Sequence, residues 1–253
     1  MESKIKLYGF NNLTKSLSFN IYDVCYAKTP GEQKDYIAYI DEQYNSERLT
    51  KIMTNLTEMI GANVLSVSKQ DYDPQGASVT FLIAENSLIP MNGEAVVAHL
   101  DKSHVTVHTY PEYHPDTSIA TFRVDIDVST CGEITPLSTL DYLIGSFDSD
   151  IITMDYRVRG FTRNIRGEKL FIDHDINSIQ EYIDPSILEK YDAVDENLRK
   201  ANLFHTKMLI KELKLQDYLF NASADELPRE QQQEIIYALS REMAEIFTGR
   251  SIG

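Results

Sequence analysis

The chain has 253 residues, 42% hydrophobic and 25% charged, which is typical of a globular protein with a sizeable core. Its net charge of -15 at pH 7 disfavours nucleic acid as a partner, because phosphate backbones are bound by clustered Lys and Arg. Cys25 and Cys131 form no CxxC pair, which argues against a zinc module or a secreted disulfide framework. With no apolar signal region and no run approaching about 18 apolar residues, we expect a cytoplasmic protein without membrane contact.

The first clear element is an amphipathic helix over residues 49–60, where apolar side chains recur every three to four positions and Gly61 follows as a C-terminal cap. Short segments rich in Val or Ile come next, with turn residues between them, and residues 86–93 are typical of a surface loop. These segments predict strands at residues 63–68, 78–84, 95–100 and 104–110.

Residues 120–128 alternate strictly between apolar and polar, which predicts a strand with one buried and one wet face. Thr135 and Pro136 predict the start of a second helix, a strand is expected over residues 150–159, and a last helix begins near Pro228. Strands cluster between helices rather than alternating with them. The order therefore predicts a single α+β domain, residues 1–253, in which helices cover one side of an antiparallel β-sheet in a sandwich-like arrangement.

Common catalytic and nucleotide-binding motifs are missing: there is no GxGxxG after a strand, no P-loop, no HExxH and no GxSxG. Four histidines, His99, His104, His108 and His114, crowd one stretch and raise the possibility of a metal site. At about 3.3 Å per residue, His104 and His108 lie roughly 13 Å apart on one strand, too far to bind one ion. This spacing argues against a histidine metal site.

Residues 99–112, H-L-D-K-S-H-V-T-V-H-T-Y-P-E, and residues 129–132, S-T-C-G, carry the most chemistry. Taken singly, each residue has an ordinary role. Ser103 suits a turn, His108 a half-buried position, and Cys131 the interior as a small apolar side chain. Only these residues taken together, in this order, indicate a specific function.

The pattern D-K-S-H-x-T-x-H-T-Y-P-E followed by S-T-C-G closely resembles the bacterial, self-processing S-adenosylmethionine decarboxylases. Further runs resemble the longer, Gram-negative form of that family, so that the resemblance spans nearly the whole chain. They are G-F-N-N-L-T-K-S-L-S-F at residues 9–19, Q-D-Y-D-P-Q-G-A-S at 70–78, D-Y-R-V-R-G-F-T-R at 155–163 and F-H-T-K-M at 204–208.

The resemblance implies cleavage between Lys102 and Ser103, which gives a β chain of residues 1–102 and an α chain of residues 103–253. The Ser103 hydroxyl would attack the Lys102 carbonyl, and the resulting ester would eliminate and lose ammonia to leave an N-terminal pyruvoyl group as the cofactor. His108 matches the acid/base of processing, a role that suits an imidazole near neutral pH. Ser78 matches an accessory serine of processing and catalysis.

The implied activity is decarboxylation of S-adenosylmethionine to the aminopropyl donor of spermidine biosynthesis. The pyruvoyl carbonyl would form a Schiff base with the substrate amine and act as an electron sink. Cys131 matches the proton donor that completes the reaction, since a thiol can exchange protons near neutrality. Glu112 matches a ribose-binding carboxylate, and Tyr72 and Tyr110 match rings that sandwich adenine, for which ordinary core packing is the alternative. The resemblance also implies activation by Mg2+, for which we assign no ligands.

An extended chain separates Ser103 from His108 by roughly 16 Å and places them on opposite faces. We therefore expect a homo-oligomer, a dimer or the tetramer of the Gram-negative form, in which His108, Ser78 and Glu112 complete the site of a neighbouring subunit. Two alternatives stay open. One is a pyruvoyl-dependent decarboxylase of ornithine or arginine, and the other is an unprocessed homologue that regulates an active partner.

Overall fold

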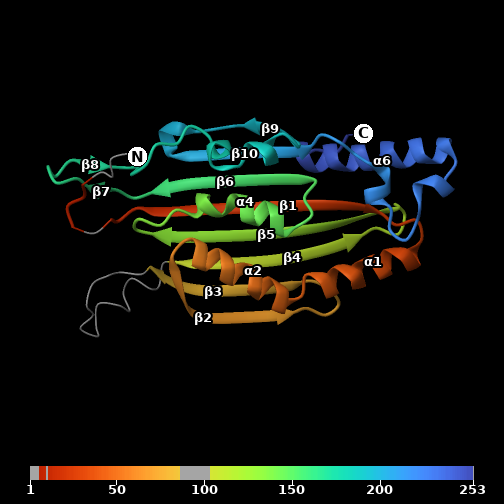
Figure 1. Ribbon diagram of the computed structural model, residues 1–253, viewed down its shortest axis with the longest axis horizontal. Coiled ribbons are helices and arrows are strands. Elements are labelled where there is room, and N and C mark those ends of the chain that lie inside the picture. Colours follow the sequence, from red (N-terminus) through yellow and green to blue (C-terminus); the bar gives the residue numbers. More distant parts are fainter. Residues whose placement is uncertain (1–5, 10, 86–102, 253) are drawn as a thin grey trace.

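The computed structural model describes residues 6–9, 11–85 and 103–252. One eight-stranded sheet, in the order β2-β3-β4-β5-β1-β6-β10-β9, organises these residues, and every neighbouring pair is antiparallel (Figure 1). Its strands are β1 (Thr14–Tyr26), β2 (Ala62–Asp71), β3 (Ala77–Glu85), β4 (His104–Tyr113), β5 (Ile119–Cys131), β6 (Ile151–Arg159), β9 (Tyr191–Asp195) and β10 (Leu203–Ile210). A separate hairpin consists of β7 (Thr162–Arg163) and β8 (Lys169–Leu170).

The first strand of the chain, β1, lies in the middle of the sheet between β5 and β6. Its apolar residues Leu17, Phe19 and Ile21 alternate with polar ones and are almost fully buried. Pairing with β5 runs from Thr14 to Tyr26 without a register shift. Strand β1 therefore joins the part of the sheet made by β2 to β5 to the part made by β6, β10 and β9.

Helices α1 and α2 have different N-terminal caps. Helix α1 opens with a capping box, in which the Thr29 Oγ1 accepts from the Glu32 N–H at 3.2 Å and a Glu32 carboxylate oxygen accepts from the Thr29 N–H at 2.7 Å. Helix α2 begins after Asn45, whose side chain accepts from the Arg48 N–H. The α-helices are α1 (Pro30–Gln43), α2 (Ser46–Met59), α4 (Leu140–Ser146), α5 (Pro185–Leu188) and α6 (Arg229–Thr248). The 3-10 turns are η1 (Pro136–Thr139), η2 (Ile179–Tyr182), η3 (Arg199–Ala201), η4 (Leu215–Tyr218) and η5 (Ala224–Glu226).

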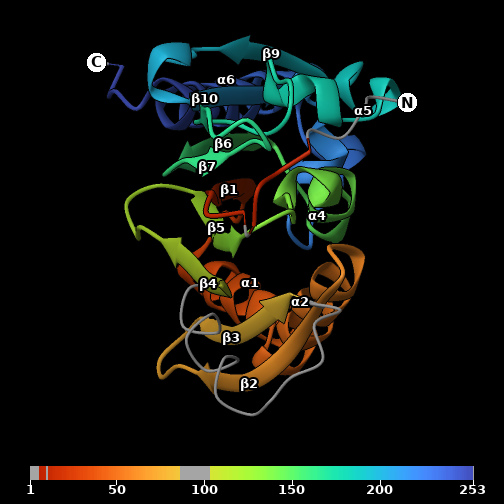
Figure 2. The same cartoon turned by 90° about the vertical axis from the view of Figure 1, so that its left-hand side faces the viewer.

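Two hydrophobic clusters hold the layers together. The larger one lies between one face of the sheet and α1, α2 and α4, which stand in front of the sheet in Figure 1, and it includes Leu49, Met53 and Leu56 of α2. The smaller one packs α6 against Val24 and Ile151, whose neighbours along β1 and β6 belong to the larger cluster. Because side chains alternate along a strand, α6 lies on the opposite face of the sheet (Figure 2). The α+β class with a helix-covered antiparallel sheet is confirmed, and α6 adds a cover on the second face.

Most predicted elements are present and somewhat longer than expected. The helix predicted over residues 49–60 is α2, with Gly61 at a φ of 73° after its end, and the strands predicted from residues 63, 78, 104, 120 and 150 are β2 to β6. Near Thr135 the chain first forms η1 and then α4. The loop and strand predicted for residues 86–100 lie outside the described residues. Among the helices that the structure describes, none is long and apolar enough to cross a membrane.

Gly76, in the turn between β2 and β3, has a φ of +89° and a backbone that closely approaches β4. A Cβ atom there would lie 2.6 Å from the carbonyl oxygen of Thr109, which is closer than van der Waals contact allows. The Gly76 N–H donates to the Asp41 carboxylate at 2.8 Å, and its carbonyl accepts from the Tyr72 N–H at 2.8 Å. The turn that carries Tyr72 therefore depends on this glycine.

We predict that Gly76→Ala lowers the free energy of unfolding by about 1–3 kcal/mol, because alanine is strained at this φ and collides with β4. The matched control is Gly145→Ala in α4, where a Cβ would meet nothing within 4 Å. That change should leave stability unchanged or raise it by up to about 1 kcal/mol, since alanine is the better helix former. Urea unfolding of both variants measures the contrast, and equal stabilities would contradict it.

Candidate functional site

Polar side chains form a row across four adjacent strands on the face of the sheet opposite the larger core. Ser78 of β3 pairs with His108 of β4, His108 pairs with Asp125 of β5, and Asp125 pairs with Asn20 of β1. The Asn20 Nδ2 donates to the Asp125 Oδ1 at 2.6 Å. Since directly opposed residues have Cβ atoms about 4.5–5.5 Å apart, a hydroxyl and a carboxylate flank the half-buried imidazole of His108.

Two tyrosines extend this row. The Tyr72 hydroxyl donates to the Ser78 Oγ at 2.7 Å, and the ring of Tyr110 stacks on that of His108 with centroids 6.2 Å apart. The guanidinium of Arg123 lies 4.2 Å from the centroid of the Tyr110 ring. The side chains of Tyr72 and Tyr110 are 40% and 43% exposed, so neither serves as a core residue. Their predicted stacking on adenine stays a prediction.

Glu112 lies two positions beyond Tyr110 along β4, on the same face and close to α6. It pairs with Thr121 of β5, and its side chain is exposed. Burial raises the pKa of Glu242 in α6, and the negative charges of Glu245 and Glu112 raise it further. Glu112 is thus an accessible carboxylate at the α6 end of the polar row.

Ser103 and Cys131 lie at the other end of the same strands. Ser103 directly precedes β4, is 4% exposed, and accepts a hydrogen bond from the Ile83 N–H at 3.1 Å through its carbonyl oxygen. Cys131 is the last residue of β5 and is 9% exposed. His104 pairs with Ser129, so continuing this register places Ser103 beside Thr130, next to Cys131. The predicted cleavage partner Lys102 lies outside the described residues.

The structure therefore divides the predicted site residues into two groups. Strand β4 pairs with β5 in a regular register from His104 to Tyr113, and no bend brings His108 back toward Ser103. Their separation along the strand is about 16 Å. One group contains Ser103 and Cys131, and the other contains Ser78, His108, Tyr72 and Tyr110 with Glu112 nearby.

Two contacts in the second group were missed from the sequence. The alternation of residues 120–128 places Asp125 on the wet face of the predicted strand. In the structure it binds Asn20 and forms an ion pair with Arg123 at 3.0 Å. The Arg123 pairing follows the i, i+2 spacing on one strand face, a usable local signal. The Asn20 contact depends on β1 lying beside β5, which no local pattern predicts.

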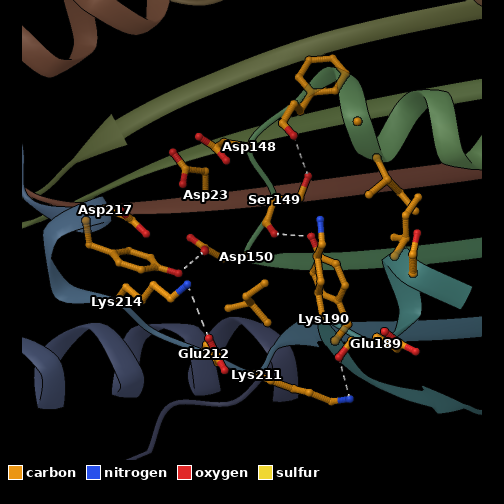
Figure 3. A pocket seen from close by; sticks show the side chains of 18 residues that line it. Asp23, Asp148, Ser149, Asp150, Glu189, Lys190, Lys211, Glu212, Lys214 and Asp217 are labelled. Carbon is orange, nitrogen blue, oxygen red and sulfur yellow. Dashed lines mark hydrogen bonds and ion pairs between the residues drawn. The ribbon is translucent and has the colours of Figure 1, made fainter.

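A pocket of about 700 Å³ lies away from these groups and is lined by charged side chains from both halves of the chain (Figure 3). Burial raises the pKa of Asp23 well above its usual value, and the nearby charges of Asp150 and Asp148 raise it further. Asp150 accepts from the Tyr218 hydroxyl at 2.6 Å and from the Val24 N–H at 2.8 Å. The carboxyl groups of Asp23 and Asp150 are hydrogen-bonded to each other. The larger rise in pKa at Asp23 favours this residue as the one that holds the proton. None of the predicted site residues that the structure describes lines this pocket.

We predict that Asp23→Asn stabilises the protein more at pH 8 than at pH 5. The pKa of Asp23 is raised in the folded chain, so unfolding releases its proton, and stability falls as pH rises from the unfolded value of about 3.9 through the folded value. Asparagine donates the same hydrogen bond and has no proton to lose. Each unit by which folding raises the pKa of Asp23 corresponds to about 1.4 kcal/mol of unfolding free energy.

Urea unfolding at both pH values measures this difference. The control is Asp225→Asn, an exposed aspartate of η5, which should change stability little at either pH. An Asp23→Asn variant that is less stable than the parent at pH 8 would contradict a protonated Asp23.

Within the ranges that the structure describes, no three or more His, Cys, Asp or Glu side chains converge as metal ligands. The predicted activation by Mg2+ therefore stays a prediction without assigned ligands.

The fold and these side chains define an α+β protein whose large antiparallel sheet displays hydroxyl, imidazole, thiol and carboxylate groups on β3, β4 and β5. A model of the family described as S-adenosylmethionine decarboxylase matches residues 39–160. A protein of Clostridium botulinum (strain Alaska E43 / Type E3), named S-adenosylmethionine decarboxylase proenzyme, is 67% identical over 100% of this chain and 98% of its own length.

Proteins with the same name from other organisms are also similar to this chain. The one from Alkaliphilus oremlandii is 64% identical over 100% of this chain and 98% of its own. The one from Halorhodospira halophila is 60% identical over 99% of this chain and 96% of its own. This chain belongs to the S-adenosylmethionine decarboxylase family.

Proposed function

We propose that this chain is a self-processing pyruvoyl enzyme, a carboxy-lyase that converts S-adenosylmethionine into the aminopropyl donor for spermidine synthesis. The observation that carries the proposal is the full-length similarity to relatives named S-adenosylmethionine decarboxylase proenzyme. The position of Ser103 at the start of β4, beside the end of β5 that carries Cys131, supports it further. In this proposal residues 1–253 form one catalytic domain that is cut into residues 1–102 and 103–253.

The surroundings of Ser103 fit a pyruvoyl group. The residue is 4% exposed, its carbonyl is held by the Ile83 N–H, and the Cys131 thiol lies at the end of the adjacent strand. A keto group at position 103 would thus be fixed at the start of β4 and largely shielded from water. When formed, such a group withdraws electrons from the α-carbon of an attached amino acid, as pyridoxal phosphate does.

Each residue has a defined task in this scheme. The Ser103 hydroxyl attacks the Lys102 carbonyl, so that the peptide bond is exchanged for an ester, and His108 accepts the proton that the following elimination releases. Ser78, fixed by the Tyr72 hydroxyl at 2.7 Å, assists. Cys131 delivers a proton to the substrate α-carbon after carbon dioxide leaves. Glu112 accepts from ribose hydroxyls, and Tyr72 and Tyr110 offer exposed rings to adenine.

The separation of the two groups supports a site shared between subunits. His108 lies about 16 Å from Ser103 along an unbroken strand, beyond the reach of direct proton transfer. A second copy of the chain would then supply the Ser78 and His108 that act on Ser103. We therefore propose a homo-oligomer as the processing unit.

We predict that Ser103→Ala abolishes self-cleavage, because no side-chain nucleophile remains at the cut. Intact mass spectrometry should find one uncut chain of 253 residues in the variant and, in the parent, fragments of 102 and 151 residues, since 253 minus 102 is 151. The larger parent fragment should also react with hydroxylamine at its N-terminus. An uncut parent chain would favour the regulatory homologue instead.

We predict that Cys131→Ser is processed but loses about 10²–10⁴ in kcat, because a hydroxyl is a poor proton donor in place of a thiol. Cys25→Ser is the matched control, since both cysteines are buried, at 8% and 9% exposure, and burial raises the pKa of the Cys25 thiol to about 12. It should retain the parent kcat. Carbon dioxide release from S-adenosylmethionine, ornithine and arginine is measured in parallel, and a preference for either plain amino acid would overturn the substrate assignment.

We predict that two inactive variants restore processing in each other's presence. Ser103→Ala supplies an intact His108, and His108→Ala supplies an intact Ser103, so their mixed oligomer contains one complete shared site. When the two chains are co-expressed with different tags, only the His108→Ala chain should be cut. If His108→Ala stays uncut in mixed oligomers that have been isolated through both tags, the site is not shared.

A further inference from the structure

The chain turns sharply directly after Cys131, and the segment that precedes and begins β1 holds that turn. Gly132 has a φ of 78°, and its N–H donates to the Leu13 carbonyl at 3.1 Å. Its carbonyl accepts from the Lys15 Nζ at 3.0 Å and from the Asn11 Nδ2 at 3.1 Å. Three hydrogen bonds with residues 11–15 thus hold the N–H and the carbonyl of Gly132, the residue that follows Cys131.

The ammonium group of Lys15 is embedded in a buried ionic network. Its side chain is 2% exposed and lies 2.8 Å from the Asp173 Oδ2, which also accepts from the Asn11 Nδ2 at 2.7 Å. The other oxygen of Asp173 is hydrogen-bonded to the His174 Nδ1 at 2.7 Å. Burial alone would raise the pKa of Asp173, but the hydrogen bonds from His174 and Lys15 hold it well below its usual value.

The network continues to the far side of the same turn. The His174 Nε2 lies 3.2 Å from the hydroxyl of Tyr156, and that hydroxyl lies 3.4 Å from the Thr135 Oγ1, at the start of η1. The Thr130 hydroxyl donates to the Ile134 carbonyl at 3.1 Å inside the turn. Residues on both sides of Cys131 are therefore tied to one buried framework.

Stability alone is a weak explanation for this arrangement. Removing a lysine and an aspartate from water costs several kcal/mol per ion, and buried ion pairs are often no better than apolar side chains of the same volume. The network instead directs two hydrogen bonds to the carbonyl of Gly132, the residue that follows Cys131. A proton donor must be held within a fraction of an ångström of its acceptor, and a misplacement of about 1 Å can cost 10²-fold in rate.

We infer that Lys15 and Asp173, together with Asn11, are positioning residues that set the place of the Cys131 thiol through the Gly132 carbonyl. The inference rests on the proposed function in one respect, the role of Cys131 as proton donor. It assigns no contact between these residues and the substrate.

The test compares the parent with Lys15→Met/Asp173→Asn, a double variant that removes both charges together and leaves neither one buried alone. Both are made with Cys25→Ser, so that Cys131 is the single cysteine. We expect the double variant to be processed and to keep KM within about threefold, while kcat falls about tenfold to a hundredfold. We expect alkylation of Cys131 by iodoacetamide, followed by mass spectrometry, to become about fivefold faster as the turn loosens.

Tyr218→Phe in the same background is the control for lost stability. It removes another buried hydrogen bond, 2.6 Å to Asp150, on a residue that lies outside this network. Its kcat and its Cys131 alkylation rate should match the parent within about twofold even where its unfolding free energy drops by about 1–3 kcal/mol.

A folded double variant with the parent kcat or the parent alkylation rate overturns the inference. If the double variant does not fold, Asn11→Ala removes one of the two carbonyl donors and should shift both readouts in the same direction by a smaller factor; no shift overturns the inference. Alkylation requires no substrate. If the parent does not decarboxylate S-adenosylmethionine, the proposed function fails, and alkylation alone still decides whether the network positions the thiol.

Discussion

The pairing of β1 with both β5 and β6 is the constraint on which the rest of the structure depends. It holds the two parts of the sheet in one ladder and sets which β1 side chains face the larger core. Its register also places Asn20 against Asp125 and brings Lys15 to the turn after Cys131. A shift of one residue would turn every β1 side chain to the opposite face, so the core and the polar row would be lost together.

The same register places different polar networks at the two ends of β1. At one end of β1, Asn11 and Lys15 donate to the Gly132 carbonyl from an ionic network that is largely buried. At the other end, the Val24 N–H donates to Asp150, which is paired with the carboxyl group of Asp23. Between them, the polar face carries half-buried and exposed groups such as His108 and Glu112. The buried charged groups of these regions are thus paired or hydrogen-bonded, and the others lie at the surface. This follows from the cost of burying a charge without a partner.

Local sequence patterns predicted much of this fold. Alternation identified β5, and the separation of Ser103 from His108 followed from strand geometry alone. Helix α1 was missed because its buried face is narrow, with Tyr36, Ile37 and Ile40, although its capping box was readable. Contacts between distant segments could not be predicted from these local patterns. The Lys15 to Asp173 ion pair spans 158 residues, and no local pattern specifies which strands become neighbours.

The symmetry of a two-subunit contact gives the proposed shared site a further consequence. A two-fold contact is isologous: if His108 of one subunit reaches Ser103 of its partner, the reverse contact forms at the same time. Two sites are then completed together, or none is. Under this geometry a single folded chain holds the proposed nucleophile Ser103 and the proposed acid/base His108 about 16 Å apart along β4. Assembly would therefore precede the cut, and an unassembled chain would keep its peptide bond without needing an inhibitor.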